Sequence, residues 1–162
     1  MFVLVRTVTY ASGFIGLLLV LLPARILTAA GIARPATAGP LQIASLVLAA
    51  LGAALATWCI LAFTFAGKGT PAPFDPPRRL VIVGPYRHLR NPMYVGAVLL
   101  LGGAAGYYGS LGLLEYAAGF FVATHLFVIA YEEPTLTRKF GDEYLEYRKR
   151  VGRWWPRLRR RP

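Results

Sequence analysis

The sequence contains a single cysteine and few acidic side chains. Cys59 lies inside an apolar block, so a disulfide within the chain and a cysteine-based metal site are both excluded. Seven Asp and Glu residues stand against eighteen Lys and Arg residues, giving a formal net charge of +11. Long polar stretches are also scarce, since 56% of the residues are hydrophobic and the mean hydropathy is +0.51. This composition excludes an ordinary soluble domain and predicts one integral membrane domain over residues 1–162.

The basic residues are concentrated in two segments. Ten of the eighteen lie in residues 138–162, and five lie in residues 68–90. Such segments suit the anionic cytoplasmic leaflet of a membrane. Nucleic acid is the alternative partner of a basic tail. Because nothing else in the chain resembles a nucleic-acid-binding module, we expect the partner to be the lipid bilayer and no nucleic acid.

The first two apolar blocks are long enough to cross a bilayer. Residues 2–22 would form a helix of about 31 Å at a rise of about 1.5 Å per residue. A cleaved signal peptide is the alternative for this block. Residues 41–65 contain no charge, and Gly52, Ala53 and Ala56 leave room there for close contact with another helix.

A forty-residue apolar stretch, residues 92–131, is too long for one span and predicts a short helical hairpin. Its turn is expected at residues 106–110, where GYYGS interrupts the apolar run. The first arm, residues 93–105, would rise only about 20 Å, whereas the second, residues 111–131, would cross fully.

The tail predicts an amphipathic helix that lies in the membrane interface. Its apolar positions are spaced as one helical face: Leu136, Phe140, Tyr144, Tyr147 and Val151. We expect Trp154 and Trp155 to lie at headgroup level.

The positive-inside rule predicts the topology. The basic segments at residues 67–91 and from 132 onward are separated by two spans, so both lie on the cytoplasmic side, as do both termini. Five prolines and three glycines exclude a continuous helix at residues 67–91, although residues 80–83 suit a short extended piece. The expected fold is therefore an all-α integral membrane protein of a bacterial inner membrane. It has about four transmembrane helices, the last two a short hairpin, and a C-terminal amphipathic interfacial helix.

Two adjacent carboxylates follow the last apolar arm. Acidic residues favour the positive end of a helix, and Pro134 fits an early helical position, so Glu132 and Glu133 suit a solvated helix start. The functional interpretation is an anionic site at the membrane surface, suited to an ammonium or sulfonium cation.

The loop GPYRHLRNPMYVG, residues 84–96, complements these carboxylates. Gly84 and Pro85 favour a sharp turn, while Tyr86 and Tyr94 offer aromatic faces and hydroxyl groups. Pro92 begins a helix whose free N–H groups suit a carboxylate or phosphate. The alternative is a basic loop that contacts lipid headgroups through Arg78, Arg79, Arg87 and Arg90. Glu115 and His125 lie in the last apolar arm, where ionisable side chains are functional candidates.

These motifs resemble the isoprenylcysteine carboxyl methyltransferase family and the related phospholipid methyltransferases. The resemblance rests on GPYRHLRNPMYVG and on EEPTLTRKFGDEYLEYRKRVGRWWP, and it covers about residues 67–156. It implies S-adenosylmethionine-dependent methyl transfer to a lipophilic or amphipathic acceptor at the cytoplasmic face. Glu132 and Glu133 are then the expected catalytic residues. The expected cofactor-binding residues are Arg79, Leu80, Val81, Tyr86, Asn91, Pro92, Met93, Tyr94 and Glu132. No metal is expected.

Two positions depart from the family pattern. Asn91 replaces the family's histidine, and an amide cannot carry charge as a general base. Val128 stands where eukaryotic members have a substrate-contacting arginine, four residues before Glu132. A prenylcysteine carboxylate is therefore a doubtful acceptor, and another lipid-like molecule is the better expectation.

Two other function classes are alternatives. Sterol and steroid reductases have a similar C-terminal architecture but bind NADPH, whose 2′-phosphate would suit Arg78, Arg79 and Arg87. A non-catalytic lipid-binding protein is the other alternative.

Overall fold

The described part of the chain is all-helical. The computed structural model describes residues 12–13, 15–67 and 79–157. Within these residues no strand forms, and the β contact seen there is an isolated parallel bridge between Leu89 and Gly152. The helical elements are η1 (Gly16–Leu21), α2 (Leu22–Ala29), α3 (Pro40–Ala62), η2 (Phe63–Gly67), η3 (Gly84–Arg87), α4 (Pro92–Tyr108), α5 (Leu111–Phe127), η4 (Val128–Glu132), α6 (Glu133–Phe140) and α7 (Asp142–Arg150).

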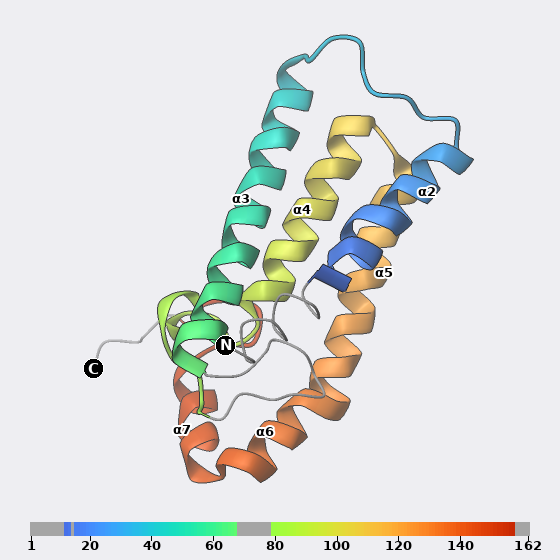
Figure 1. The fold of residues 1–162 in the computed structure, drawn as a ribbon. Helices are drawn as coiled ribbons and strands as arrows, with labels where there is room; N and C mark the ends of the chain where they lie inside the picture. The colour runs from blue at the N-terminus through green and yellow to red at the C-terminus, as the bar shows by residue number, and fades with distance from the viewer. Residues whose placement is uncertain (1–11, 14, 68–78, 158–162) are drawn as a thin grey trace.

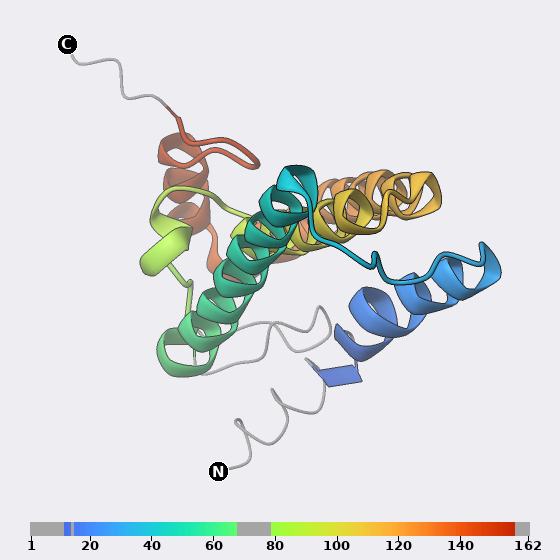
Figure 2. The same ribbon diagram turned by 90° about the horizontal axis from the view of Figure 1, so that it is seen from above.

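Three long helices form a layer in which α4 packs between α3 and α5 (Figure 1). The helix α2 packs against α5, to one side of this layer when it is seen from above (Figure 2). Glycine allows α3 and α4 to approach closely, as expected for small residues between membrane helices. A Cβ on Gly52 would lie 2.5 Å from the Gly96 carbonyl oxygen, and one on Gly103 would lie 2.5 Å from the Ala49 backbone nitrogen. The close contact predicted at Gly52 is confirmed.

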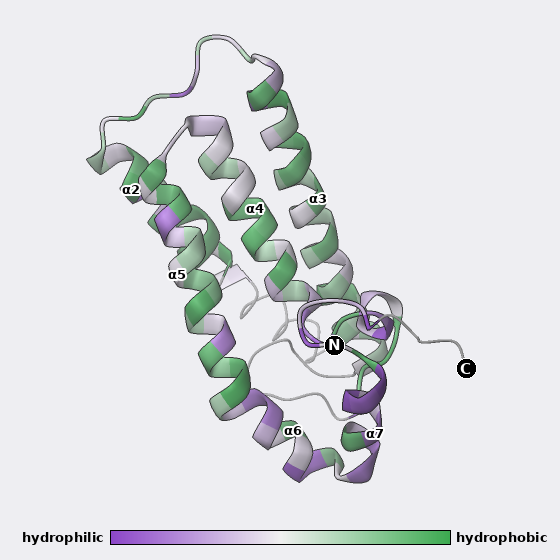
Figure 3. Cartoon of the chain, turned by 180° about the vertical axis from the view of Figure 1, so that it is seen from behind, coloured by the Kyte–Doolittle hydropathy of each residue, from purple (hydrophilic) through white to green (hydrophobic). Residues whose placement is uncertain are grey.

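Two helices are long and apolar enough to cross a membrane, Pro40–Gly67 and Leu111–Phe140. Gly16–Ala29 is a shorter apolar helix, and α4 has seventeen residues, a length of about 25 Å. Figure 3 shows hydrophobic residues along the long helices and hydrophilic residues gathered on α6 and α7. The apolar spans predicted at residues 41–65 and 111–131 are confirmed as long apolar helices, whereas the count of four transmembrane helices stays a prediction. Residues 2–11 and residue 14 of the first block lie outside the described residues.

The first apolar helix ends seven residues later than predicted. The apolar run predicted that the first span ends at residue 22, with a loop after it. Instead η1 and α2 run together through Ala29, and the Leu22 N–H donates to the Leu17 carbonyl five residues earlier. This wider π-type turn directly precedes Pro23. The same arrangement recurs at the other end of the molecule, where η4 directly precedes Glu133 and Pro134.

The predicted hairpin turn is confirmed, although it is tighter than expected. Gly109 adopts a left-handed conformation with φ of 60°, and Ser110 accepts a hydrogen bond from the Leu113 N–H through its hydroxyl oxygen. The second arm does not end at residue 131, however. The helix continues through η4 and α6 to Phe140, so Glu132 and Glu133 lie within a helix rather than at the start of a new one.

The tail is not one continuous helix. Gly141, with φ of 52° and ψ of −128°, ends α6 and starts α7, which folds back beside it (Figure 1). Tyr144, Tyr147 and Val151 are buried, and the predicted apolar positions converge on Leu80 and Ile82 rather than on one flat face. The regular spacing of these apolar residues therefore reflects an apolar cluster formed by α6, α7 and the loop that contains Leu80 and Ile82. Trp155 is 82% exposed.

Candidate functional site

Three segments meet at the hydrophilic end of the molecule: residues 79–91, the junction of η4 with α6, and the chain after α7. We call residues 151–157 the C-terminal strap. The Arg90 N–H donates to the Gly152 carbonyl at 2.9 Å, and the Asn91 side-chain amide donates to the Arg153 carbonyl at 3.4 Å. From α7, the Tyr147 hydroxyl donates to the Tyr86 carbonyl at 2.6 Å. Hydrogen bonds from α7 and with the strap therefore hold the loop, residues 79–91, in place.

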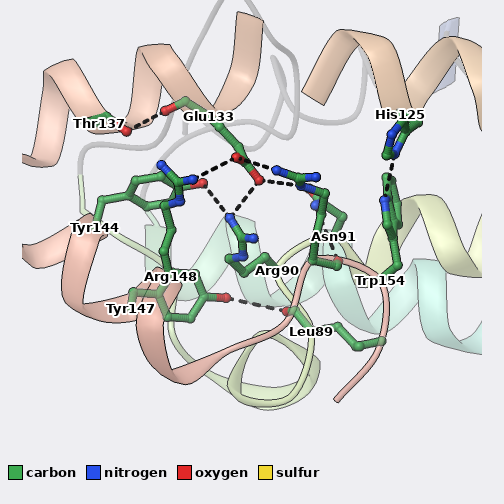
Figure 4. Close-up of polar contacts among 11 residues, drawn as sticks. Leu89, Arg90, Asn91, His125, Glu133, Thr137, Tyr144, Tyr147, Arg148 and Trp154 are labelled. Atoms are coloured by element: carbon green, nitrogen blue, oxygen red, sulfur yellow. Dashed lines mark hydrogen bonds and ion pairs between the residues drawn. The ribbon is translucent and has the colours of Figure 1, made fainter. Parts of the chain in front are cut away.

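Glu133 is the centre of an ionic cluster (Figure 4). Its carboxylate accepts from Arg90 at 2.6 Å and from Arg153 at 2.7 Å and 2.9 Å, and Arg148 lies 3.5 Å away. The Glu133 and Arg90 side chains are only 7% and 8% exposed. Because the three arginines come from the loop, α7 and the strap, one carboxylate joins four separate segments. Bonding to Glu133 also raises the pKa of Arg153, which keeps this partner charged.

Glu132, the neighbouring residue, has a different environment. Its carboxylate accepts a hydrogen bond of 3.2 Å from the Tyr94 hydroxyl on α4. Among the described residues it takes part in no ion pair, although it lies one position from a carboxylate surrounded by arginines. A partly buried anion without a cation partner is electrostatically unsatisfied. Such a group suits a positively charged ligand.

Tyr86, in the loop, lies within electrostatic range of this carboxylate. It packs with Cys59 and Val81, and its ring contacts Phe63 edge-on at a centroid distance of 5.1 Å. Burial raises the pKa of Tyr86 well above its ordinary value, and the hydroxyl's proximity to Cys59 and Glu132 adds to the shift. The phenol is therefore neutral at physiological pH. Tyr86 and Glu132 thus lie near one another at the same end of the molecule.

The remaining predicted cofactor residues divide between two sides of the loop. Val81 and Met93 pack around Tyr86, whereas Leu80 packs against the tyrosines of α7. Arg79 is exposed. The pair Asn91 and Pro92 is buried at the start of α4. The structure therefore brings Val81, Tyr86, Met93, Tyr94 and Glu132 to one region and turns Leu80 and Asn91 toward α7 and the strap.

His125 connects α5 to the strap. The Trp154 indole N–H donates to Nδ1 of His125 at 2.9 Å, and the Trp154 ring meets Phe121 edge-on at 5.1 Å. In Figure 4 this pair lies apart from the Glu133 cluster. By contrast, Glu115 is exposed near the opposite end of α5, and Val128 is fully buried.

Sequence reasoning missed the partners of Glu133. Each loop arginine, taken singly, resembled a headgroup contact, and Arg148 and Arg153 were only part of a basic tail. No local pattern links residues 90, 133 and 153, because their contact depends on the fold-back at Gly141. The sequence feature that could have indicated these contacts is the excess of arginine in the loop and tail, together with a carboxylate, Glu133, that follows an apolar helix.

The sequence matches the model of a known protein family. The family model of the phospholipid methyltransferases matches residues 41–143, well over half of the chain. The chain belongs to the phospholipid methyltransferase family. This confirms the resemblance noted from the motifs and indicates methyl transfer to a lipid-like acceptor. No curated protein and no solved structure matches the chain. Family membership and the two long apolar helices together indicate a membrane protein.

Proposed function

We propose that this protein transfers the methyl group of S-adenosylmethionine to a lipophilic acceptor at the cytoplasmic face of the membrane. The observation that carries the proposal is Glu132, a carboxylate that receives one hydrogen bond from Tyr94 and has no cation partner among the described residues. It lies in the segment that the family match covers. The basic strap and α7 at the same end support a cytoplasmic orientation.

The residues around Glu132 fit this cofactor, which carries an ammonium, a carboxylate, a sulfonium and an adenosine. Glu132 would hold the ammonium. A carboxylate against the sulfonium itself would stabilise the ground state more than the transition state, because positive charge leaves sulfur during transfer. The first N–H groups of α4, at Met93 and Tyr94, have no partner within the helix and suit the cofactor carboxylate. Apolar walls would come from Val81, Tyr86 and Met93.

The bound cofactor would supply an activated methyl group. The protein's own residues would position the cofactor and the acceptor and would exclude water. Tyr94 orients the Glu132 carboxylate by donating to one of its oxygens. Glu133 holds the loop, α7 and the strap together, so we propose a positioning role for it; the catalytic role predicted for Glu133 stays a prediction. A carboxylate acceptor needs no general base, whereas an amine or hydroxyl acceptor must lose a proton.

The remaining cofactor residues predicted from the motifs keep a place in this proposal. Asn91 and Pro92 stand at the start of α4, where the Asn91 side-chain amide donates to the Arg153 carbonyl of the strap. Leu80 continues the loop wall on the side of α7, and the exposed Arg79 precedes it in the loop.

The test is transfer of radiolabelled methyl from S-adenosylmethionine into a total bacterial lipid extract, followed by identification of the product. The wild-type protein is expected to label a lipid and to bind S-adenosylmethionine in preference to NADPH. Glu132→Gln should abolish most of the transfer, and Glu115→Gln is the matched control on the same helix. Preferential NADPH binding would favour a reductase. Lipid binding without methyl transfer by the wild type, retained in Glu132→Gln and Tyr86→Ala, would favour a non-catalytic lipid-binding protein.

A further inference from the structure

His125 is an ionisable residue well inside the helix that runs from Leu111 to Phe140. Ionisable side chains at such depth are uncommon and are retained where a ligand or a partner uses them. Here one partner is visible, the Trp154 indole of the C-terminal strap. Trp154 contacts Nδ1 of His125, and among the described residues neither the fold nor the proposed reaction uses Nε2.

The contact with Trp154 determines the tautomer of His125. An indole N–H can only donate, so Nδ1 of His125 must accept and therefore carries no proton. In a neutral imidazole the proton then lies on Nε2. Among the described residues, Nε2 makes no hydrogen bond. His125 thus presents one N–H donor that is held in a fixed direction by its other nitrogen.

The wall around this donor is aromatic. Phe121 lies one turn earlier on α5 and packs against both the imidazole and the indole, at centroid distances of 6.1 Å and 5.1 Å. His125 and Trp154 are both partly exposed, and Phe121 is 38% exposed. A single polar donor in an apolar wall is the usual means of fixing the orientation of a lipophilic ligand.

The strap connects this donor to the proposed reaction centre. Consecutive strap residues make the two contacts, since Arg153 binds Glu133 and Trp154 binds His125. His125 and Glu133 therefore lie on the side of the helix that faces the strap. Seven residues separate His125 from Glu132, about 10 Å along a helix. The arginines around Glu133 mark the charged end, and His125 lies deeper toward the apolar part.

We propose that His125, held by Trp154, binds the methyl acceptor by donating its Nε2–H to an ester carbonyl oxygen of a diacyl lipid. This inference rests on the proposed function. The headgroup region of one leaflet is about 5–8 Å thick, so an acceptor whose headgroup reacts near Glu132 places its ester linkages near His125. A neutral donor matches a neutral carbonyl, whereas the phosphate lies at the level of the arginines. His125 and Trp154 then select acceptors that carry ester-linked chains.

The experiment compares two probes, diacyl phosphatidylethanolamine and its dialkyl ether analogue, each in vesicles of ether-linked phosphatidylcholine. Wild type, His125→Phe and His125→Gln are assayed with radiolabelled S-adenosylmethionine, and cofactor affinity is measured separately by calorimetry. His125→Phe keeps a ring but loses the donor. His125→Gln accepts from Trp154 through its carbonyl and donates through its NH₂ group.

The expected result is a split between the two probes. His125→Phe raises KM for the diacyl lipid roughly fivefold to tenfold, the effect of losing one hydrogen bond. It leaves KM for the ether lipid, kcat and cofactor affinity close to the wild-type values. His125→Gln restores most of the affinity for the diacyl lipid.

Three outcomes would overturn the assignment. Equal KM for His125→Phe and wild type on the diacyl lipid would show that Nε2 does not bind the acceptor. An equal loss of cofactor affinity in His125→Phe and His125→Gln would show that His125 only holds the strap. Absence of transfer to either probe by the wild type would reject the diacyl lipid as acceptor. Absence of cofactor binding by the wild type would instead reject the proposed function itself.

Discussion

Glu132 and Glu133 are adjacent in the sequence, yet their surroundings differ in kind. Arg90, Arg148 and Arg153 lie within 4.0 Å of Glu133, whereas Glu132 receives a hydrogen bond from the neutral hydroxyl of Tyr94. The comparison shows that a carboxylate pair at the end of an apolar helix can serve two purposes. One member joins separate segments through arginines, and the other, which makes no ion pair among the described residues, is the one that we propose binds a ligand.

The difference follows from how the segments fold back. Gly141 turns α7 beneath the loop, which delivers Arg148 and, through the strap, Arg153 to one side of the helix. Tyr94 lies on α4 and reaches the other carboxylate. Separating the roles of the two carboxylates therefore requires one stability measurement and one ligand-binding measurement for each variant.

The largest expected effect is on stability, in Glu133→Gln. Removing this charge leaves buried Arg90 and its neighbour Arg153 without a counterion. Breaking a buried ion pair in this way costs about 3–5 kcal/mol. Thermal unfolding in detergent should show a large fall in Tm.

The matched control is Glu146→Gln, which breaks the exposed pair with Lys149 and should leave Tm unchanged. Equal Tm values for Glu133→Gln and the wild type would contradict the structural role of the cluster.

The next effect is on cofactor binding, in Glu132→Gln. Loss of a charged hydrogen bond to a cation is expected to weaken S-adenosylmethionine binding by about tenfold to a hundredfold. Because Glu132 has no ion pair among the described residues, Tm should change little. Calorimetric titration measures the affinity, and a fall in Tm as large as that of Glu133→Gln would remove the distinction between the two carboxylates.

A smaller effect is expected in Tyr94→Phe, which keeps the ring and removes the hydroxyl that donates to Glu132. A neutral hydrogen bond contributes about 0.5–1.5 kcal/mol, so the cofactor affinity should fall about twofold to tenfold. Tyr131→Phe, on the exposed side of η4, is the control. An affinity loss in Tyr94→Phe greater than in Glu132→Gln would show that Tyr94 binds the cofactor on its own account.

The smallest expected effect is in Arg148→Gln. This side chain is 39% exposed and lies 3.5 Å from Glu133, and partly solvated pairs contribute about 0–1 kcal/mol. Tm should fall slightly in Arg148→Gln and clearly more in Arg153→Gln, whose guanidinium donates twice to Glu133. A larger fall in Tm for Arg148→Gln than for Arg153→Gln would indicate that the contact of Glu133 with α7 stabilises the protein more than its contact with the strap.

The sequence predicted the parts of the fold that depend on local pattern. Uninterrupted apolar runs gave α3 and α5, small residues gave the close contact of α3 with α4, and GYYGS gave the turn before α5. It failed at residue 22, where the predicted first span ends but the helix continues through Ala29, and at Glu132 and Glu133, which lie within a continuous helix rather than at the start of a new one. In each case a π-type turn precedes a proline within the helix. Residues 68–78, which the loop prediction included, lie outside the described residues.

The site was predictable in its residue types but not in its pairings. The loop tyrosines and the two glutamates stood out as polar groups beside apolar helices, and the structure places Tyr94 against Glu132. The arginine partners of Glu133 were not predictable, since nothing local indicated that Gly141 would reverse the chain. The π-type turn η4, which ends at Glu132, was not predicted from the sequence either.

The most direct test of charge recognition by Glu132 uses two ligands that lack the sulfonium. S-adenosylhomocysteine retains the amino-acid portion, whereas 5′-methylthioadenosine lacks it. If Glu132 holds the ammonium, Glu132→Gln weakens binding of S-adenosylhomocysteine by about tenfold or more and leaves binding of 5′-methylthioadenosine unchanged. Equal losses for both ligands, or a loss for neither, would contradict the account.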